Sequence, residues 1–177
     1  MLASNNKYPT IYAFIDSQNL NLGTSKDLYD KNGNRVYVGW KLDYQKFRLY
    51  LTNKFRVTKA FFFIGYVAGN ARFYTKLKNL GYSVVLKPTV RDSAGKPKGN
   101  VDAELVLHSA AIEFSNYDKA VVVSSDGDFH CLYEYLEKHS KLGSVIIPNR
   151  KTASTLLKRF TSYQYELIRD RAKLEKI

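Results

Sequence analysis

Five short apolar runs alternate with longer helical segments, and this alternation limits what the chain can fold into. In chain order the runs are IYAFI at 11–15, AFFFIGYV at 60–67, YSVVL at 82–86, AVVV at 120–123 and SVII at 144–147. Short runs with little polar alternation are typical of parallel strands that are covered on both faces. Such strands, separated by helices, predict an α/β fold: a three-layer α/β/α sandwich around a central parallel sheet of five strands.

The segments between the runs have helical periodicity with two departures. Helices are predicted over 41–55, 71–80, 101–114 and 128–139, the second with Asn70 as its cap and Gly81 at its end. Asn32-Gly33, with Tyr and Val on both sides, indicates a β-hairpin inserted at about 27–40. The region from 151 to 177 is predicted to be a basic helical segment with Leu156, Leu157, Phe160, Tyr165 and Leu167 packed inward. We expect a tail over 1–9 and one domain over 10–177.

Cysteine content and hydropathy indicate a cytoplasmic protein. Cys131 is the chain's single cysteine, so no intrachain disulfide can form, which is typical of a reducing compartment. The first residues lack the basic and then apolar pattern of a signal peptide. No apolar run approaches the roughly 20 residues that span a bilayer, so a membrane location is not predicted.

The charge balance indicates a polyanionic partner. The chain has 28 Lys and Arg against 16 Asp and Glu, a formal net charge of +12. A positive field of this size favours nucleic acid and speeds its encounter with the protein. Aromatic residues make up 14% of the chain, and exposed rings could stack on unpaired bases. Nucleic acid is the predicted partner; an anionic membrane surface or an acidic protein stays open as an alternative.

Aspartates follow two of the predicted strands directly. Asp16 comes after the first run, and Asp126 and Asp128 come after the fourth, separated by a glycine that permits a tight turn. Ligands of open parallel sheets bind at the carboxyl ends of the strands, so these side chains should meet at one edge. Asp102 opens a helix in the segment that must return to that edge. Each aspartate also has a structural interpretation, as the cap of a turn or of a helix.

Clustered carboxylates repel one another, and a divalent cation relieves that repulsion. Carboxylate oxygens are ligands for Mg²⁺ or Mn²⁺, whereas no His and Cys set has the spacing of a zinc site. The sequence leaves one and two metal ions open. Glu104 should point away from Asp102, and Cys131 and Trp40 are predicted to lie in the core. The three histidines have no shared spacing that would predict a metal site: His108, His130 and His139.

The segments YAFIDSQN, KGNVDAEL and VVVSSDGDF, in this order, resemble the NYN domains of the PIN-like nuclease superfamily, including their bacterial LabA-like branch. The resemblance extends from about Ile11 to Phe160. It implies a Rossmann-like fold of the PIN type with strand order 3-2-1-4-5, and metal-dependent cleavage of RNA. Ser17-Gln18 and Ser124-Ser125 depart from the pairs that are frequent in the family, and the hairpin has no counterpart that we can match.

Position by position, the resemblance assigns catalytic and metal-binding roles to Asp16, Asp102, Asp126 and Asp128, and supporting roles to Asn19, Ser124 and Lys98. We therefore predict a ribonuclease that uses Mg²⁺ or Mn²⁺, and a homodimer as its assembly. Alternatives are a non-catalytic RNA-binding or protein-interaction module, and a D-x-D phosphatase with Asp126 as nucleophile and Asp128 as general acid. Basic residues predicted to bind the RNA backbone are Arg91, Lys96, Lys98, Arg150 and Lys151, with Lys158 and Arg159 extending the same track.

Overall fold

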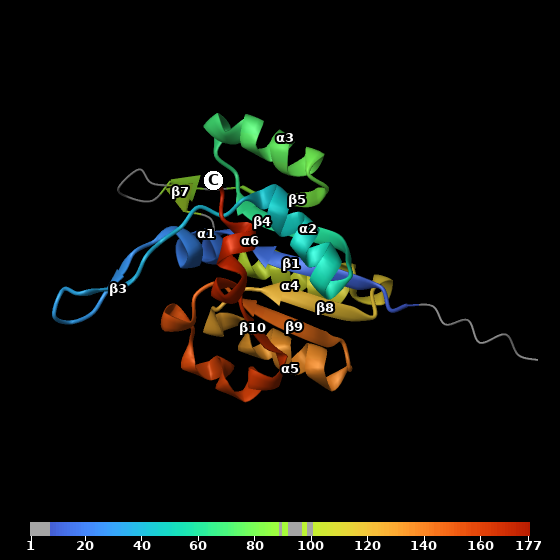
Figure 1. Cartoon of the computed structure of the whole chain (residues 1–177). Helices are drawn as coiled ribbons and strands as arrows, with labels where there is room; N and C mark the ends of the chain where they lie inside the picture. The colour runs from blue at the N-terminus through green and yellow to red at the C-terminus, as the bar shows by residue number, and fades with distance from the viewer. Residues whose placement is uncertain (1–7, 89, 92–96, 99–100) are drawn as a thin grey trace, which may run out of the picture.

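The computed structural model describes residues 8–88, 90–91, 97–98 and 101–177, and its centre is a six-stranded sheet in which every pairing is parallel (Figure 1). The strand order is β5-β4-β1-β8-β9-β10. Numbered in chain order within this sheet, its first five strands adopt the predicted order 3-2-1-4-5. Their bounds are β1 (Ile11–Asp16), β4 (Val57–Gly65), β5 (Tyr82–Lys87), β8 (Lys119–Val123), β9 (Leu142–Ile147) and β10 (Gln164–Glu166).

Strand β10 corrects the predicted strand count of five. It pairs in parallel with β9, placing Tyr165 opposite Ile146 at the edge of the sheet. Its three residues are only partly buried and contain a single apolar side chain. An edge strand this short has no apolar run and no alternation, which are the two signals that mark a strand in a sequence.

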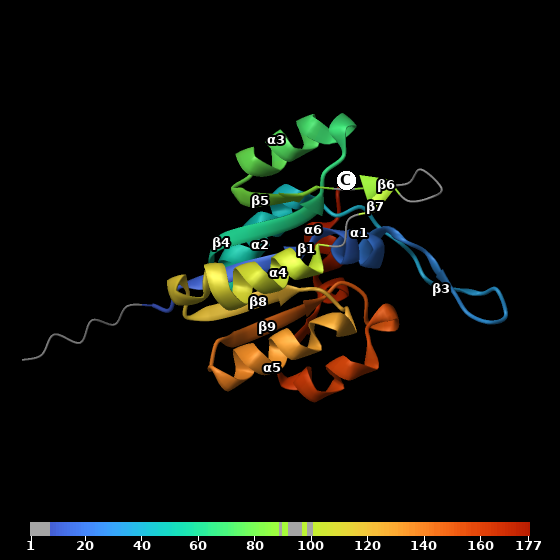
Figure 2. The same cartoon turned by 180° about the vertical axis from the view of Figure 1, so that it is seen from behind.

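Helices cover both faces of the sheet, as the alternation of strand residues requires. Along β1, Phe14 packs in one buried cluster, whereas Ala13 and Ile15 pack in the other. The Ala13 side is covered by α1 (Ser17–Ser25), α2 (Tyr44–Phe55), α3 (Ala71–Asn79) and α6 (Arg171–Leu174), and the Phe14 side by α4 (Asp102–Leu107) and α5 (His130–Lys138) (Figures 1 and 2). The three layers are those predicted. Within the described segments, no helix is long and apolar enough to cross a membrane.

Several helices differ from their predicted form. Helix α1 was not predicted, because its sequence, SQNLNLGTS, is mostly polar. The helix predicted over 101–114 is α4 followed by a π-helical turn (His108–Ile112) and a 3-10 turn (Phe114–Asn116). A 3-10 turn (Gly127–Phe129) precedes α5. Cys131 is exposed on α5, which corrects its predicted core position, because the buried face of that helix is formed by Leu132, Tyr133 and Leu136.

The C-terminal region is mainly 3-10 turns instead of the predicted α-helix, over Arg150–Thr152, Thr155–Tyr163 and Leu167–Asp170. Leu156 is 55% exposed, contrary to prediction, whereas Leu157, Phe160 and Leu167 are buried. Tertiary contacts hold the region in place. Asp170 forms an ion pair with Lys54 at 2.9 Å and accepts hydrogen bonds from two tyrosine hydroxyls, which lowers the pKa of its carboxyl.

Two small hairpins project beyond the edge at which the parallel strands end (Figures 1 and 2). The first is the predicted hairpin, formed by β2 (Leu28–Tyr29) and β3 (Arg35–Tyr37), with Gly33 in its turn at a φ of 80°. Trp40 closes it and is buried as predicted, with its indole N–H donating to the Tyr37 hydroxyl. The second is formed by β6 (Val90–Arg91) and β7 (Pro97–Lys98).

Candidate metal centre

Asp16 ends β1 and is buried, with 4% of its surface exposed. One carboxylate oxygen accepts the backbone N–H groups of Gln18 and Asn19, at 3.1 and 3.0 Å, so Asp16 caps α1. The other oxygen accepts the Ser124 hydroxyl at 3.2 Å. The structural interpretation of Asp16 as a cap is therefore correct, and the same side chain also links the ends of β1 and β8.

The segment after β8 forms a tight turn that is tied to α1. The Ser125 backbone N–H and hydroxyl both donate to the side-chain oxygen of Asn19, at 2.9 and 3.0 Å. Asp126 accepts the backbone N–H of Asp128 at 3.0 Å, and its own N–H donates to the Ser124 hydroxyl. The Asn19 side chain thus holds this turn, while its backbone N–H holds the Asp16 carboxylate.

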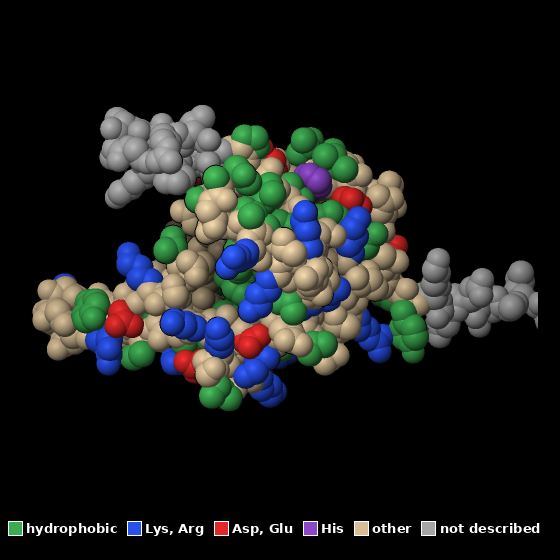
Figure 3. Space-filling view, turned by 90° about the horizontal axis from the view of Figure 1, so that it is seen from above, with side chains coloured by type: hydrophobic (Ala, Val, Ile, Leu, Met, Phe, Trp, Pro, Cys, Tyr) green, Lys and Arg blue, Asp and Glu red, His purple; other side chains and the backbone are tan. Residues whose placement is uncertain are grey.

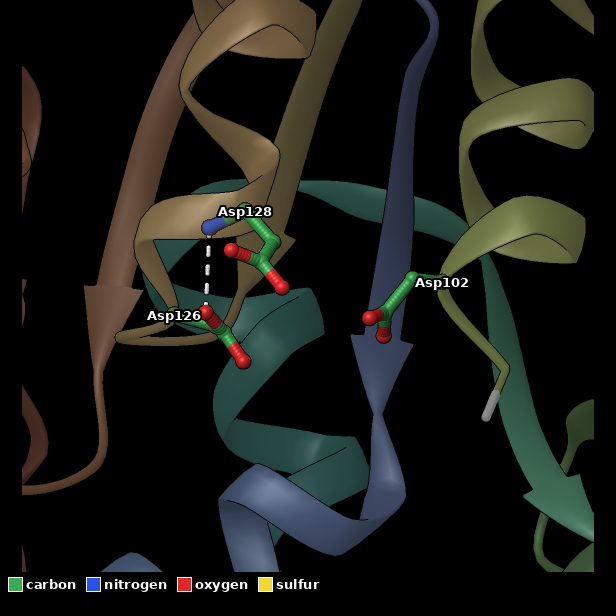
Figure 4. A group of neighbouring side chains, drawn as sticks. All are labelled: Asp102, Asp126 and Asp128. Carbon is green, nitrogen blue, oxygen red and sulfur yellow. Dashed lines mark hydrogen bonds between the residues drawn. The ribbon is translucent and has the colours of Figure 1, made fainter. Parts of the chain in front are cut away.

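Three carboxylates meet at this edge of the sheet. Each of Asp102, Asp126 and Asp128 offers one oxygen, and these oxygens lie within 4.8 Å of one another (Figure 4). Asp102 and Asp126 are partly buried, and Asp128 is exposed. Asp102 comes from the first turn of α4, whose N-cap residue is Val101, so it is not the cap of its helix. The structure thereby joins chain segments that are 24 residues apart in the sequence.

Electrostatics connect Asp16 to this cluster. Burial, together with the nearby charges of Asp102 and Asp126, raises the pKa of Asp16 to about 6, against the lowering effect of its hydrogen bonds from Asn19 and Ser124. Tyr133 lies close enough to be affected as well: burial first, and then Asp16 and Asp126, raise the pKa of its hydroxyl. That hydroxyl is buried and has no hydrogen-bond partner among the described residues. Asp16 is therefore buried beside charges of its own sign.

The donor set fits a hard divalent cation. All the converging groups are carboxylates, and oxygen ligands of this kind suit Mg²⁺ or Mn²⁺. Burial is the main cause of the raised pKa of Asp16, and a cation would offset the further contribution from the charges of Asp102 and Asp126. Within the described part of the chain, the cluster includes none of the histidines. His108 packs against Phe61 and Phe63, His130 against Phe160, and His139 against Tyr135.

Gly127 lets the turn approach the C-terminal region closely. A Cβ atom at this position would lie 2.3 Å from the hydroxyl oxygen and 2.9 Å from the Cβ of Ser154. Ser154 is itself fixed, because its backbone N–H donates to the Ser125 carbonyl at 3.1 Å. The close contact therefore determines the position of the two aspartates on either side of the glycine. The sequence predicted the tight turn but not its partner Ser154.

We expect Gly127→Ala to lower the metal-dependent activity of this centre by about 100-fold, because displacing a site by about 1 Å costs on that order. Steady-state assays of that activity measure the effect. Gly69→Ala is the matched control, since a Cβ there meets nothing within 4 Å. Adding Ser154→Gly to the first variant removes the two closest atoms, leaves only the end of the Leu156 side chain at 3.2 Å, and should recover activity. Full activity of Gly127→Ala alone would contradict this role of the contact.

The basic residues predicted to bind RNA are distributed unevenly. Arg91 and Lys98 lie in β6 and β7, and Lys96 falls outside the described residues. Arg150 contacts Gln164, and Arg159 forms ion pairs with Glu134 and Glu137. Lys151 and Lys158 are exposed. Glu104 pairs with Lys87 at 2.8 Å, apart from the carboxylate cluster, as its position relative to Asp102 predicted.

Comparisons with known proteins agree with this geometry. A crystal structure of a Vibrio parahaemolyticus protein of unknown function superposes with a TM-score of 0.65, at 22% identity over 94% of this chain and 96% of that one. At this identity the likeness concerns the fold alone. No curated protein matches the chain significantly. The family model of the NYN domain matches residues 10–167. The chain, with its aspartates at the carboxyl edge of a PIN-like sheet, belongs to the NYN domain family.

Proposed function

We propose that this protein is a divalent-metal-dependent ribonuclease. The observation that carries the proposal is the meeting of Asp102, Asp126 and Asp128 at one sheet edge, with their oxygens within 4.8 Å. Carboxylates on the surface of a nucleic-acid-binding protein oppose the substrate unless a cation offsets them. The net charge of +12 favours a polyanionic substrate, and nucleic acid is a polyanion of this kind. Membership of the NYN family supports the same activity.

The four aspartates would have different roles, because their burial and hydrogen bonds differ. Asp102, Asp126 and Asp128 would hold Mg²⁺ or Mn²⁺, the exposed Asp128 on the solvent side. Asp16 is fixed by three hydrogen bonds and would complete the acidic site from within. When bound, the cation supplies charge neutralisation at the phosphate and a lower pKa for the attacking water. Ser124 bridges Asp16 and the backbone of Asp126, and so keeps the two strand ends in register.

Metal removal and substrate comparison test the proposal. The purified protein is treated with EDTA, dialysed, and incubated with single-stranded RNA, structured RNA or DNA, with and without added Mg²⁺ or Mn²⁺. We expect RNA cleavage only with added metal, because the carboxylates alone repel the phosphate. The Asp126→Asn/Asp128→Asn variant, purified in parallel, detects contaminating nucleases.

Each result has a definite meaning. RNA cleavage that persists in EDTA, or equally in the double variant, contradicts the proposal. RNA binding with no cleavage under any metal condition supports a non-catalytic binding module instead. Cleavage of DNA in preference to RNA contradicts the choice of substrate while leaving the metal centre in place.

A further inference from the structure

A second basic feature lies at the base of the first hairpin, apart from the carboxylates. It is a cavity of about 360 Å³ between the end of α1, the start of α2 and α3. Its walls include Asn21 and Ser25 from α1 and Asp43 from the start of α2. Three lysines from separate segments also line it: Lys41, Lys76 and Lys176. We call these three residues the lysine triad.

Backbone pairing places two members of the lysine triad opposite each other. Leu42 and Glu175 form an antiparallel bridge, and the Lys176 N–H donates to the Lys41 carbonyl at 2.8 Å. Lys41 and Lys176 therefore occupy facing positions on neighbouring extended segments. Like charges that face each other in this way destabilise the pairing. An anion between them would turn this repulsion into attraction.

Nearby carboxylates do not compensate the lysine triad. The Asp43 carboxylate accepts the backbone N–H groups of Gln45 and Lys46, at 2.9 and 3.1 Å, as the cap of α2. Glu175 makes two hydrogen bonds to the Arg171 guanidinium, both at 2.9 Å. Within the residues that the structure describes, no ion pair involves a member of the triad. Three lysines against the one carboxylate in the lining, Asp43, leave the cavity with an excess of positive charge.

Helix α1 runs from the acidic edge of the sheet, where Asp16 caps it, to the cavity. Asp16 caps the first turn of α1, whereas Ser25, which lines the cavity, ends that helix. Nine helical residues span roughly 13 Å, so one extended RNA strand can reach both places. Figure 3, which looks onto the α3 side, shows Lys and Arg side chains gathered beside the hairpin with few acidic ones among them.

We propose that the lysine triad binds a backbone phosphate of the RNA strand whose scissile bond lies at the carboxylates. This inference rests on the proposed ribonuclease function and adds a position for the RNA strand beyond the metal centre. A phosphate group is small enough for the cavity and carries the charge that the triad lacks. The contact is with backbone and not with bases, so it adds affinity without sequence preference.

Binding is measured without turnover, to separate this inference from the activity. The Asp126→Asn/Asp128→Asn protein is titrated in EDTA with a fluorescently labelled ten-nucleotide RNA strand, at several salt concentrations. The test variant adds Lys41→Gln and Lys76→Gln. The control adds Lys78→Gln and Lys138→Gln, which removes the same charge from exposed lysines outside the cavity. Trp40, the single tryptophan, precedes Lys41 in the chain, and its emission is recorded in each titration.

We expect the Lys41/Lys76 variant to raise the Kd about tenfold and the control to change it less than about twofold. The slope of log K against log salt should fall by about 0.7 for the lost phosphate contact on a single strand. RNA should shift Trp40 emission in the parent protein and not in the test variant. Equal weakening by both variants would overturn the inference, because a diffuse positive field would then explain the binding.

Two further results separate the cavity from the nuclease. If inorganic phosphate alone shifts Trp40 emission while RNA does not, the cavity is a small-anion site and the RNA assignment is overturned. If wild-type protein cleaves RNA and the Lys41/Lys76 changes leave its KM unaltered, the inference fails and the nuclease stands. If RNA binding depends on the lysine triad but no metal supports cleavage, the proposed function fails and the phosphate contact stands.

Discussion

Asp126→Asn and Asp128→Asn should each lower RNA cleavage by at least about 100-fold at saturating Mg²⁺. The amide keeps the size of the carboxylate but removes the charge that would hold the cation. Losing about 3 kcal/mol of transition-state stabilisation corresponds to slightly more than two factors of ten in rate. Asp102→Asn should behave in the same way, because its carboxylate belongs to the same cluster. Single-turnover cleavage of a labelled RNA measures the loss.

The effects of these changes should not add. Residues that act as one unit lose nearly all their contribution with the first substitution, so the double variant should be little worse than either single one. Asp118→Asn is the control: this aspartate precedes β8 at the opposite edge of the sheet and accepts the backbone N–H of Thr10. Activity losses that multiply, or an equal loss in Asp118→Asn, would contradict a shared centre.

The metal-free protein should lose stability as the pH rises from about 4 to about 6. The pKa of Asp16 is about 6 in the folded protein against 3.8 for the ordinary group, so in this window the folded state holds a proton that the unfolded chain releases. The free energy of unfolding therefore falls with rising pH, by roughly 3 kcal/mol across about two pH units. Above pH 6 the loss is complete, because Asp16 is ionised in both states. Urea unfolding in EDTA at several pH values measures it.

Asp16→Asn isolates this contribution. Asparagine can still cap α1, although the hydrogen bond from Ser124 is lost at a cost of roughly 1 kcal/mol. The variant should therefore be more stable than the wild type above pH 6 by about 2 kcal/mol, and the difference between them should shrink toward pH 4. Saturating Mn²⁺ should reverse the order by stabilising the wild type. If the free energies of unfolding of the two proteins change in parallel with pH, burial and neighbouring charge do not raise the pKa of Asp16.

The sequence predicted those parts of the fold and site that follow from local pattern. Short apolar runs identified five strands, and the rule that ligands gather at strand ends placed Asp16, Asp126 and Asp128 together. Predicting the position of Asp102 required one more inference, that the chain returns to the same edge before the fourth strand. The strand prediction is confirmed, because parallel strands fix which strand ends meet. At that edge the converging oxygens are those of Asp102, Asp126 and Asp128, while Asp16 is bonded to Ser124.

The remaining features depend on contacts between distant segments. Leu156 continues a helical apolar pattern, yet it lies on the exposed side of a 3-10 turn that tertiary contacts determine. The approach of Gly127 to Ser154, and the facing positions of Lys41 and Lys176, join residues that no periodicity relates. The sequence pattern of Tyr133 is that of an ordinary core residue of a helix. The fold shows that its hydroxyl is buried without a hydrogen-bond partner among the described residues, and that Asp16 lies close enough to affect its pKa.

Anomalous diffraction from crystals soaked in Mn²⁺ shows whether these aspartates form a divalent metal centre. We expect a strong anomalous peak among Asp102, Asp126 and Asp128, within coordination distance of their carboxylate oxygens. The peak should be absent from crystals of Asp126→Asn/Asp128→Asn grown under the same conditions. Wild-type crystals that show no peak at this edge, or a peak that persists in the double variant, would contradict the claim.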